Sequence, residues 1–287
     1  MALSRTEWLD RERAHQERAD ALTADHRDRA ARGEKHPVFD FLFTYYAYKP
    51  AQLRRWHPGA GVELHDAPER ASWRWYSPGS SADAVVPDPA RYAAEKPELA
   101  GLVERMLRRT AARPAQFGCF GLHEWAMVYR AEEHRHPVPL RLGRDGTDAV
   151  VEAHDLRCTH FDAFRFFTPD AVPRNRSALT RDEQPLVEQP GCLHAGMDLY
   201  KWAMKLGPLV PGELLLDTFE LARDIRLLDM QAAPYDLSAW GVEPVPIETA
   251  EGKAEYVRRQ RIFAERGAAL RSALLDAWLG EGRSAAA

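Results

Sequence analysis

Two neighbouring helical segments joined by a short turn constrain the fold of this chain more than any other feature of its sequence. Apolar residues recur at helical spacing over 191–206 and again over 212–231. The run from Gly207 to Gly212, which contains two prolines, joins these segments. Because so short a connection brings consecutive helices side by side, we expect them to pack antiparallel as a central helical hairpin.

The second of these helices carries carboxylates inside its apolar face. At about 100° per residue, four acidic residues fall on one stripe that has leucines on both sides: Glu213, Asp217, Glu220 and Asp224. An ordinary amphipathic helix places its carboxylates opposite its leucines. We therefore expect these four groups to be partly removed from water.

The first helix has a matching stripe, formed by His194, Asp198, Lys201 and Lys205. Counting outward from the turn places Lys201 near Asp217, Asp198 near Glu220, and His194 near Asp224. Two interpretations stay open. The stripes form an interhelical salt-bridge ladder that sets the register, or they form a site whose carboxylates have raised pKa values and act as general acid or base, or hold a metal with His194.

The remaining pattern predicts one mainly α (α+β) domain over residues 1–287. Further helices are expected at 4–33, where Ser4 and Glu7 can form a capping box, and at 97–110, 121–132 and 249–279. We expect two small β hairpins: one pairs 61–65 with 72–76, and the other turns at Asp145-Gly146 between Leu140 and Val151. Residues 80–91 predict a surface loop, and about 280–287 predict a disordered tail.

Composition narrows the class of protein. The chain is 45% hydrophobic and 29% charged, which allows a core, and no apolar run approaches membrane-spanning length. Dense charge from Arg5 to Lys35 argues against a signal peptide, and three widely spaced cysteines do not form a disulfide framework. We expect a soluble cytoplasmic protein with no membrane partner and predict no particular oligomeric state. Walker A, Rossmann, His-Glu-x-x-His and Gly-x-Ser-x-Gly motifs are absent.

Two shorter segments supply further candidate polar groups. His123 and Glu124 interrupt the apolar start of the helix expected at 121–132. His160, Asp162 and Arg165 lie among the aromatic residues of 158–167. Convergent polar groups in aromatic surroundings suit a flat ligand, which stacks and is then fixed by hydrogen bonds. They suit a core with a buried polar network equally well.

Four distinctive stretches carry a resemblance to a known family, and the resemblance covers nearly the whole chain. They are the run Gly33-Glu34-Lys35-His36-Pro37-Val38-Phe39-Asp40-Phe41-Leu42-Phe43-Thr44-Tyr45-Tyr46, then Pro50 to Gly59, Cys158 to Phe167, and Pro190 to Tyr235. The chain resembles a family of actinobacterial proteins commonly labelled 3-methyladenine DNA glycosylase. The resemblance implies hydrolysis of the N-glycosidic bond of an alkylated purine, and it transfers no catalytic residue.

Three functional hypotheses follow. The first is an N-glycosidic bond hydrolase acting on a modified purine, in DNA or in a free nucleoside. Glu220 or Asp224 would stabilise the oxocarbenium-like sugar, and Lys201 would be a Schiff-base nucleophile if strands are also cleaved. The base would stack on aromatic side chains of Tyr45, Tyr46, Phe161 and Trp202. This hypothesis requires no cofactor, and a net charge of −4 with only Arg54 and Arg55 locally basic predicts weak, salt-sensitive DNA binding at most.

The second hypothesis is a metal-dependent enzyme, such as an iron oxygenase or a hydrolase. Its divalent metal would be held by His194, Asp198, Glu220 and Asp224, joined by His123 or His160. The third is a non-catalytic protein that binds a small flat molecule. In that protein the polar stripes have only a structural role.

Overall fold

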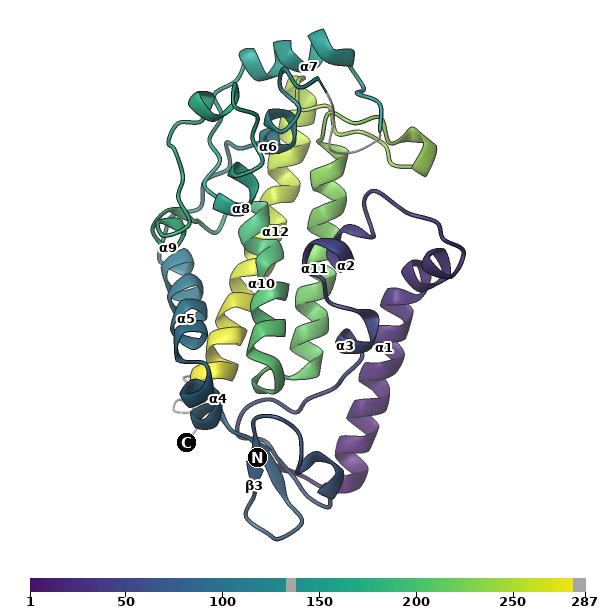
Figure 1. Cartoon of the computed structure of the whole chain (residues 1–287), viewed down its shortest axis with the longest axis vertical. Helices are drawn as coiled ribbons and strands as arrows, with labels where there is room; N and C mark the ends of the chain where they lie inside the picture. Colours follow the sequence, from purple (N-terminus) through teal and green to yellow (C-terminus); the bar gives the residue numbers. More distant parts are fainter. Residues whose placement is uncertain (133–137, 281–287) are drawn as a thin grey trace.

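The predicted helical hairpin forms the centre of the molecule (Figure 1). A computed structural model describes residues 1–132 and 138–280, so the tail expected from about residue 280 falls, after Gly280 itself, outside the described residues. Helices α10 (Leu193–Leu206) and α11 (Gly212–Gln231) run antiparallel from the turn η3 (Gly207–Leu209). Helix α12 (Ala250–Leu279) packs along both of them. The mainly α class and the central hairpin are therefore confirmed.

Small residues bring the central helices close together. A Cβ atom added to Gly196 of α10 would lie 2.8 Å from Cδ1 of Ile225 on α11. On α12, Gly267 faces the same region and lies near Leu199 and Leu221. These leucines and Ile225 are buried. The seam between α10 and α11 is therefore filled at this level by apolar side chains.

Two longer helices flank the central group on opposite sides (Figure 1). Helix α1 (Arg5–Ala31) lies beside α11, and its start has the predicted capping box between Ser4 and Glu7. Helix α5 (Pro97–Ala111), preceded by α4 (Pro89–Glu95), lies on the other side against α12 and α10. The helices expected at 4–33, 97–110 and 249–279 are thus confirmed within one or two residues.

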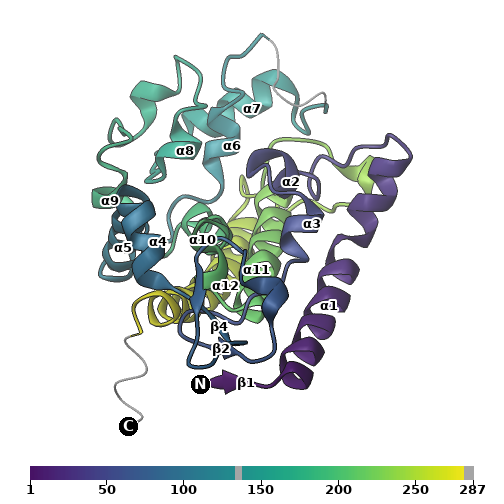
Figure 2. The same ribbon diagram turned by 60° about the horizontal axis from the view of Figure 1, so that its bottom comes forward.

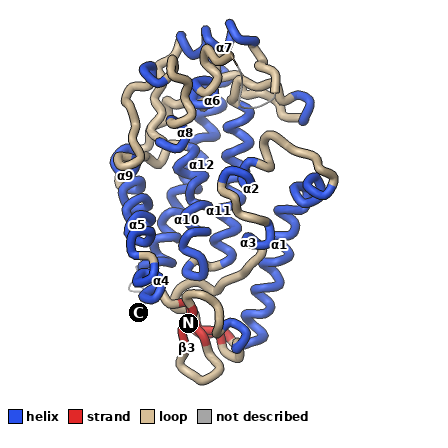
Figure 3. Tube along the Cα trace, viewed as in Figure 1, coloured by secondary structure: helices blue, strands red, loops and turns tan. Residues whose placement is uncertain are grey.

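A small sheet closes one end of the molecule (Figures 2 and 3). Its strands are β1 (Ala2–Leu3), β2 (Glu63–Leu64), β3 (Tyr76–Pro78) and β4 (Val85–Pro87), in the order β1-β2-β4-β3. The predicted pairing of 61–65 with 72–76 is wrong, because β4, from the expected surface loop, lies between β2 and β3. Between β2 and β3, the guanidinium of Arg70 lies over the rings of Trp8, Trp56 and Trp73, at 3.9 Å from the centroid of the Trp73 ring.

The second predicted hairpin is also wrong. Residues around Asp145-Gly146 form helix α7 (Gly143–Glu152) instead. Thr147, Val150 and Val151 are buried on this helix, and spacings of three and four place them on one helical face. Asp145 lies in the first turn, where a negative charge favours a helix N-terminus. Helical periodicity therefore outweighs the local turn signal here.

Irregular segments and short helices cover the other end of the bundle (Figure 1). The helix expected at 121–132 is only α6 (Leu122–Ala126). The remaining short elements, which are not all at this end, are α2 (Phe41–Tyr45), α3 (Pro50–Leu53), η1 (Pro68–Arg70), α8 (Phe161–Phe164), η2 (Val172–Arg174), α9 (Gln184–Val187) and η4 (Ser238–Trp240).

The three cysteines are free, and no described helix has the length and apolarity needed to cross a membrane.

Candidate functional site

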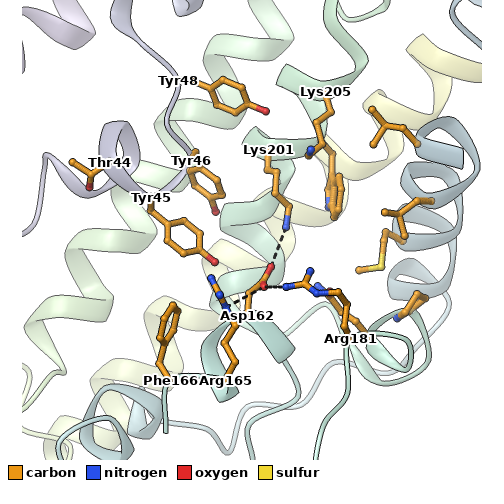
Figure 4. Close-up of a pocket in the computed structure, with 16 residues that line it drawn as sticks. Thr44, Tyr45, Tyr46, Tyr48, Asp162, Arg165, Phe166, Arg181, Lys201 and Lys205 are labelled. Atoms are coloured by element: carbon orange, nitrogen blue, oxygen red, sulfur yellow. Dashed lines mark hydrogen bonds and ion pairs between the residues drawn. The ribbon is translucent and has the colours of Figure 1, made fainter. Parts of the chain in front are cut away.

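An open pocket of about 630 Å³ lies between α5, α9 and α10, next to α8 and the segment after α2 (Figure 4). One part of its lining is aromatic: Tyr45, Tyr46, Tyr48, Phe166 and Trp202. Another part is basic: Arg165, Arg181, Lys201 and Lys205. Asp162 is the acidic residue among these lining residues, so the lining has a net positive charge.

Three of the basic side chains surround the carboxylate of Asp162. Its Oδ1 accepts a hydrogen bond from Nη2 of Arg181 at 3.1 Å and lies 3.5 Å from Nε of Arg165. Its Oδ2 lies 3.6 Å from Nζ of Lys201 (Figure 4). Helix α8 places this carboxylate in its first turn, and 14% of the side chain is exposed. The aromatic segment 158–167 therefore supplies a polar group to the pocket, as its composition predicts.

A buried network lies directly behind the pocket wall. Asp198 is 2% exposed; its Oδ1 accepts from the hydroxyl of Tyr46 at 2.9 Å, and its Oδ2 accepts from Lys201. Nε2 of His160 lies 3.3 Å from the same Oδ2. Burial raises the pKa of Asp198 even though Lys201 opposes the shift. Burial disfavours the charged form of Lys201, but the Asp198 carboxylate holds the pKa of this lysine above its usual value.

His160 remains neutral in this network. Burial, together with nearby His194 and Lys201, holds the pKa of His160 well below its usual value. On its other side, Nδ1 of His160 lies 3.8 Å from Oε2 of Glu188. Burial and the nearby Asp198 carboxylate raise the pKa of Glu188. Behind the pocket wall, the neutral imidazole of His160 therefore lies between the buried carboxyl groups of Asp198 and Glu188.

A second buried cluster lies deeper in the bundle. Nη1 of Arg226 donates to Oε1 of Glu124 and to Oδ2 of Asp229, each at 2.9 Å. Nε2 of His123 lies 3.0 Å from the other oxygen of Asp229. The ring of His194 lies 4.3 Å from that of His123 and 5.1 Å from that of His160, measured between centroids. His194 therefore connects the two clusters.

A small cavity of about 20 Å³ links the deeper cluster to the open pocket. Glu124, His194 and Arg226 line it on the inner side. Tyr45, Asp162 and Phe166 line both this cavity and the open pocket. Burial and the carboxylates of Asp198 and Asp162 raise the pKa of Tyr45 to about 12, so its hydroxyl keeps its proton at neutral pH.

The predicted pairing across the central hairpin is wrong. Asp217 and Glu220 both pair with Arg18 of α1, at 2.7 and 2.9 Å. Asp224 pairs with Arg266 of α12 at 2.9 Å and is about one third exposed. The acidic stripe of α11 therefore faces α1 and α12, because the apolar contact at Gly196 occupies the seam with α10. Glu220 and Asp224 do not meet Asp198, and no carboxylate ladder forms between these helices.

The α11 carboxylate that does approach α10 is Asp229. Its ligand atoms and those of His123 and His194 lie within 4.8 Å of one another. The metal set predicted from His194, Asp198, Glu220 and Asp224 is therefore not brought together. The sequence does not predict Arg226, Asp229, Glu188 or Arg181 as site residues. Only Arg226 and Asp229 had a signal, since two charges three residues apart lie among Leu227, Leu228 and Met230.

The predicted ligand-binding residues separate into two groups. Tyr45, Tyr46, Trp202 and Arg165 line the open pocket. Phe161 instead packs against the guanidinium of Arg181 at 5.0 Å, outside the pocket lining. His123 and Glu124 are buried in the deeper cluster, where they are 3% and 4% exposed. They are therefore not positioned to contact a ligand in the open pocket.

The turn before α11 is used for packing. The amide of Gly212, at the start of α11, donates to the carbonyl of His57 at 2.9 Å. This amide is therefore not free to bind a phosphate oxygen of DNA. In the locally basic region, Nε of Arg54 pairs with Asp20 at 3.0 Å, and Arg55 lies over the ring of Trp73.

Comparisons of the chain with protein-family models, with curated proteins and with solved structures find no match.

Proposed function

We propose that this chain is an N-glycosidic bond hydrolase that acts on a modified purine nucleotide in the open pocket. The observation that carries the proposal is the position of Asp162 in the wall of a pocket that is both aromatic and basic. The resemblance to 3-methyladenine DNA glycosylases suggests the same class of reaction. This proposal replaces Glu220 and Asp224 with Asp162, because those two carboxylates pair with Arg18 and Arg266 away from the pocket.

The lining favours a flat anionic substrate. Tyrosine and tryptophan rings provide faces on which a purine can stack. Arg165, Arg181, Lys201 and Lys205 provide donors for a phosphate, and guanidinium groups bind phosphate oxygens in pairs. A volume of about 630 Å³ lies within the range of small-molecule sites. A nucleotide combines both kinds of group in one molecule.

Asp162 supplies the charge that the reaction needs. When the base leaves, positive charge develops on the sugar, and a fixed carboxylate beside it lowers the barrier. The cations around Asp162 hold the carboxylate in one orientation. The same carboxylate can orient the attacking water. His160 is a positioning residue, since it contacts Asp198 and reaches Asp162 only through Lys201.

The test is base release by the wild-type chain and by Asp162→Asn. Candidate substrates are purine nucleoside monophosphates, their alkylated forms, and DNA that contains 3-methyladenine, with the free base measured by chromatography. The amide keeps the shape of Asp162 and removes its charge, so we expect activity to fall by about 100-fold or more with the fold preserved. Asp182→Asn is the matched control, because Asp182 is an exposed acid that is not among the residues lining the pocket.

Full activity in Asp162→Asn would contradict this assignment. If the wild-type chain binds a purine nucleotide in the pocket and releases no base from any of these substrates, the hydrolase proposal fails. The protein would then be a small-molecule binding protein. Calorimetry with the same nucleotides shows whether a chain that releases no base still binds them in the pocket.

A further inference from the structure

We propose that His123, His194 and Asp229 bind one divalent transition-metal ion beneath the open pocket. Nε2 of His123 and Oδ1 of Asp229 are 3.0 Å apart, and neither atom makes a hydrogen bond to any other described group. Two ligands about 2.1 Å from one ion lie roughly 3.4 Å apart at the tetrahedral angle and roughly 3.0 Å apart at a right angle. Both atoms are buried, in side chains that are 3% and 0% exposed. Their spacing fits two ligands of one ion.

His194 completes a set of three ligands. Its ligand atom lies within 4.8 Å of the other two, so small side-chain shifts bring all three to one ion. Among the described side-chain contacts, His194 makes ring contacts with His123 and His160. Its imidazole is therefore not held by a strong competing interaction. Two imidazoles and one carboxylate are a donor set for Zn²⁺ or Fe²⁺, whereas Mg²⁺ and Ca²⁺ prefer oxygen ligands.

Arg226 orients the carboxylates of this site. It donates to Oδ2 of Asp229 and to Oε1 of Glu124. The second oxygen of each carboxylate, Oδ1 of Asp229 and Oε2 of Glu124, is buried without a hydrogen-bond partner. An outer residue that fixes one oxygen and leaves the other for the metal is a common arrangement around metal ligands. If the ion held a water there, the free oxygen of Glu124, which lines the same inner cavity as His194, would be the group to accept its proton.

The structure also has room for that water. The cavity of about 20 Å³ is lined by His194, Glu124 and Arg226 and can hold one water molecule. Tyr45, Asp162 and Phe166 separate it from the open pocket and line both spaces. Three protein ligands with a fourth position open to water are typical of catalytic metal sites.

The neighbouring group of His160, Glu188 and Asp198 is less suited to a metal. Both oxygens of Asp198 already accept hydrogen bonds, one from Tyr46 and one from Lys201. Oε2 of Glu188 accepts from Gln184 at 3.0 Å. The ammonium of Lys201 therefore supplies the positive charge that an ion would supply there. This difference assigns the ion to the group that contains His194.

The experiment uses the full-length chain and Co²⁺ as the probe, so its readout does not depend on hydrolase activity. After chelation and dialysis, bound cobalt is measured by elemental analysis and by its visible absorption. We expect one ion per wild-type chain, retained in His160→Ala and at least 10-fold weaker in His194→Ala. Circular dichroism and thermal melts check the fold of each variant.

No cobalt uptake by the wild-type chain would overturn the proposal, and so would equal uptake by His194→Ala. Loss of the ion in His160→Ala with retention in His194→Ala would place it in the other group and also overturn it. A second measurement needs no variant. X-ray absorption of the cobalt-loaded wild-type chain should show two imidazole ligands, whereas one or none contradicts the assignment.

Discussion

The hydroxyl of Tyr46 donates a hydrogen bond to Oδ1 of Asp198 at 2.9 Å and joins segments that lie 152 residues apart. Lys201 donates to the other oxygen of the same carboxylate. Asp198 therefore holds Tyr46 of the aromatic lining and Lys201 of the basic lining in place. Because Tyr45 precedes Tyr46 and packs against its ring, this bond also positions Tyr45 between the open pocket and the inner cavity.

Tyr46→Phe should destabilise the protein while preserving its packing. The ring contacts with Tyr45 and Tyr200 remain, but the buried oxygen of Asp198 loses its donor. Such a loss costs about 1–3 kcal/mol. Urea unfolding measures the change. Tyr48→Phe is the matched control, because Tyr48 packs on the same Tyr200 ring and its hydroxyl makes no hydrogen bond to the residues that the structure describes. Equal stability of the two variants would contradict the structural role of this bond.

Glu220→Gln should change the free energy of unfolding by less than about 1 kcal/mol. The side chain is 30% exposed and shares Arg18 with Asp217, and exposed ion pairs contribute little. Glu124→Gln should instead cost about 3–5 kcal/mol, since it leaves the buried Arg226 with one carboxylate fewer. Denaturant melts of both variants provide the comparison. If Glu220→Gln unfolds more readily than Glu124→Gln, the assigned environments are reversed.

The sequence predicts the elements of this fold better than their contacts. The turn at 207–212 and the helical spacing on both sides define α10 and α11 within two residues. A helical wheel gives the direction of each stripe on its own helix and nothing about which neighbour faces it. The close contact at Gly196, together with α1 and α12 against α11, decides that the acidic stripe pairs with Arg18 and Arg266.

The candidate site was predictable where polar residues interrupt an aromatic run. The aromatic run 158–167 marks Asp162 and His160 as candidate polar groups, and both lie at or behind the pocket. Arg181 and Glu188 come from an irregular segment, where no periodicity marks which side chains point inward. Asp229 lies on α11 five residues beyond Asp224, so the spacing of three and four residues that defines the predicted stripe does not include it. Its role depends on α6, a short helix whose position the sequence does not define.

Gly212→Ala should destabilise the protein, although alanine favours helices. A Cβ at Gly212 would lie 2.5 Å from Cδ1 of Trp56 and 2.7 Å from Nδ1 of His15, and both side chains are buried. Overpacking of this kind costs about 1–3 kcal/mol. Gly101→Ala in α5 is the control, because its Cβ would meet only the mobile end of Arg105, and we expect a gain of roughly 0.5–1 kcal/mol. Thermal melts that move in the same direction for both would refute this explanation.

His15 should make the protein less stable as the pH falls below about 6.5. The side chain is 3% exposed, its Nε2–H donates to the carbonyl of Leu53 at 2.9 Å, and its Nδ1 makes no well-formed hydrogen bond to the described residues. Burial lowers the pKa of His15 in the folded state, so the unfolded chain takes up this proton first. Stability is then lost from pH 6.5 downward, by at most about 1.4 kcal/mol per pH unit, until the folded-state pKa is reached. His15→Gln keeps an N–H donor and cannot titrate. As the pH falls, the wild type should therefore lose stability relative to this variant. Urea unfolding at pH 7.5, 6.0 and 5.0 measures this difference, with His65→Gln, whose side chain is 36% exposed, as the control. A difference for His15→Gln that stays constant over these three pH values would show that His15 is not held neutral by its burial.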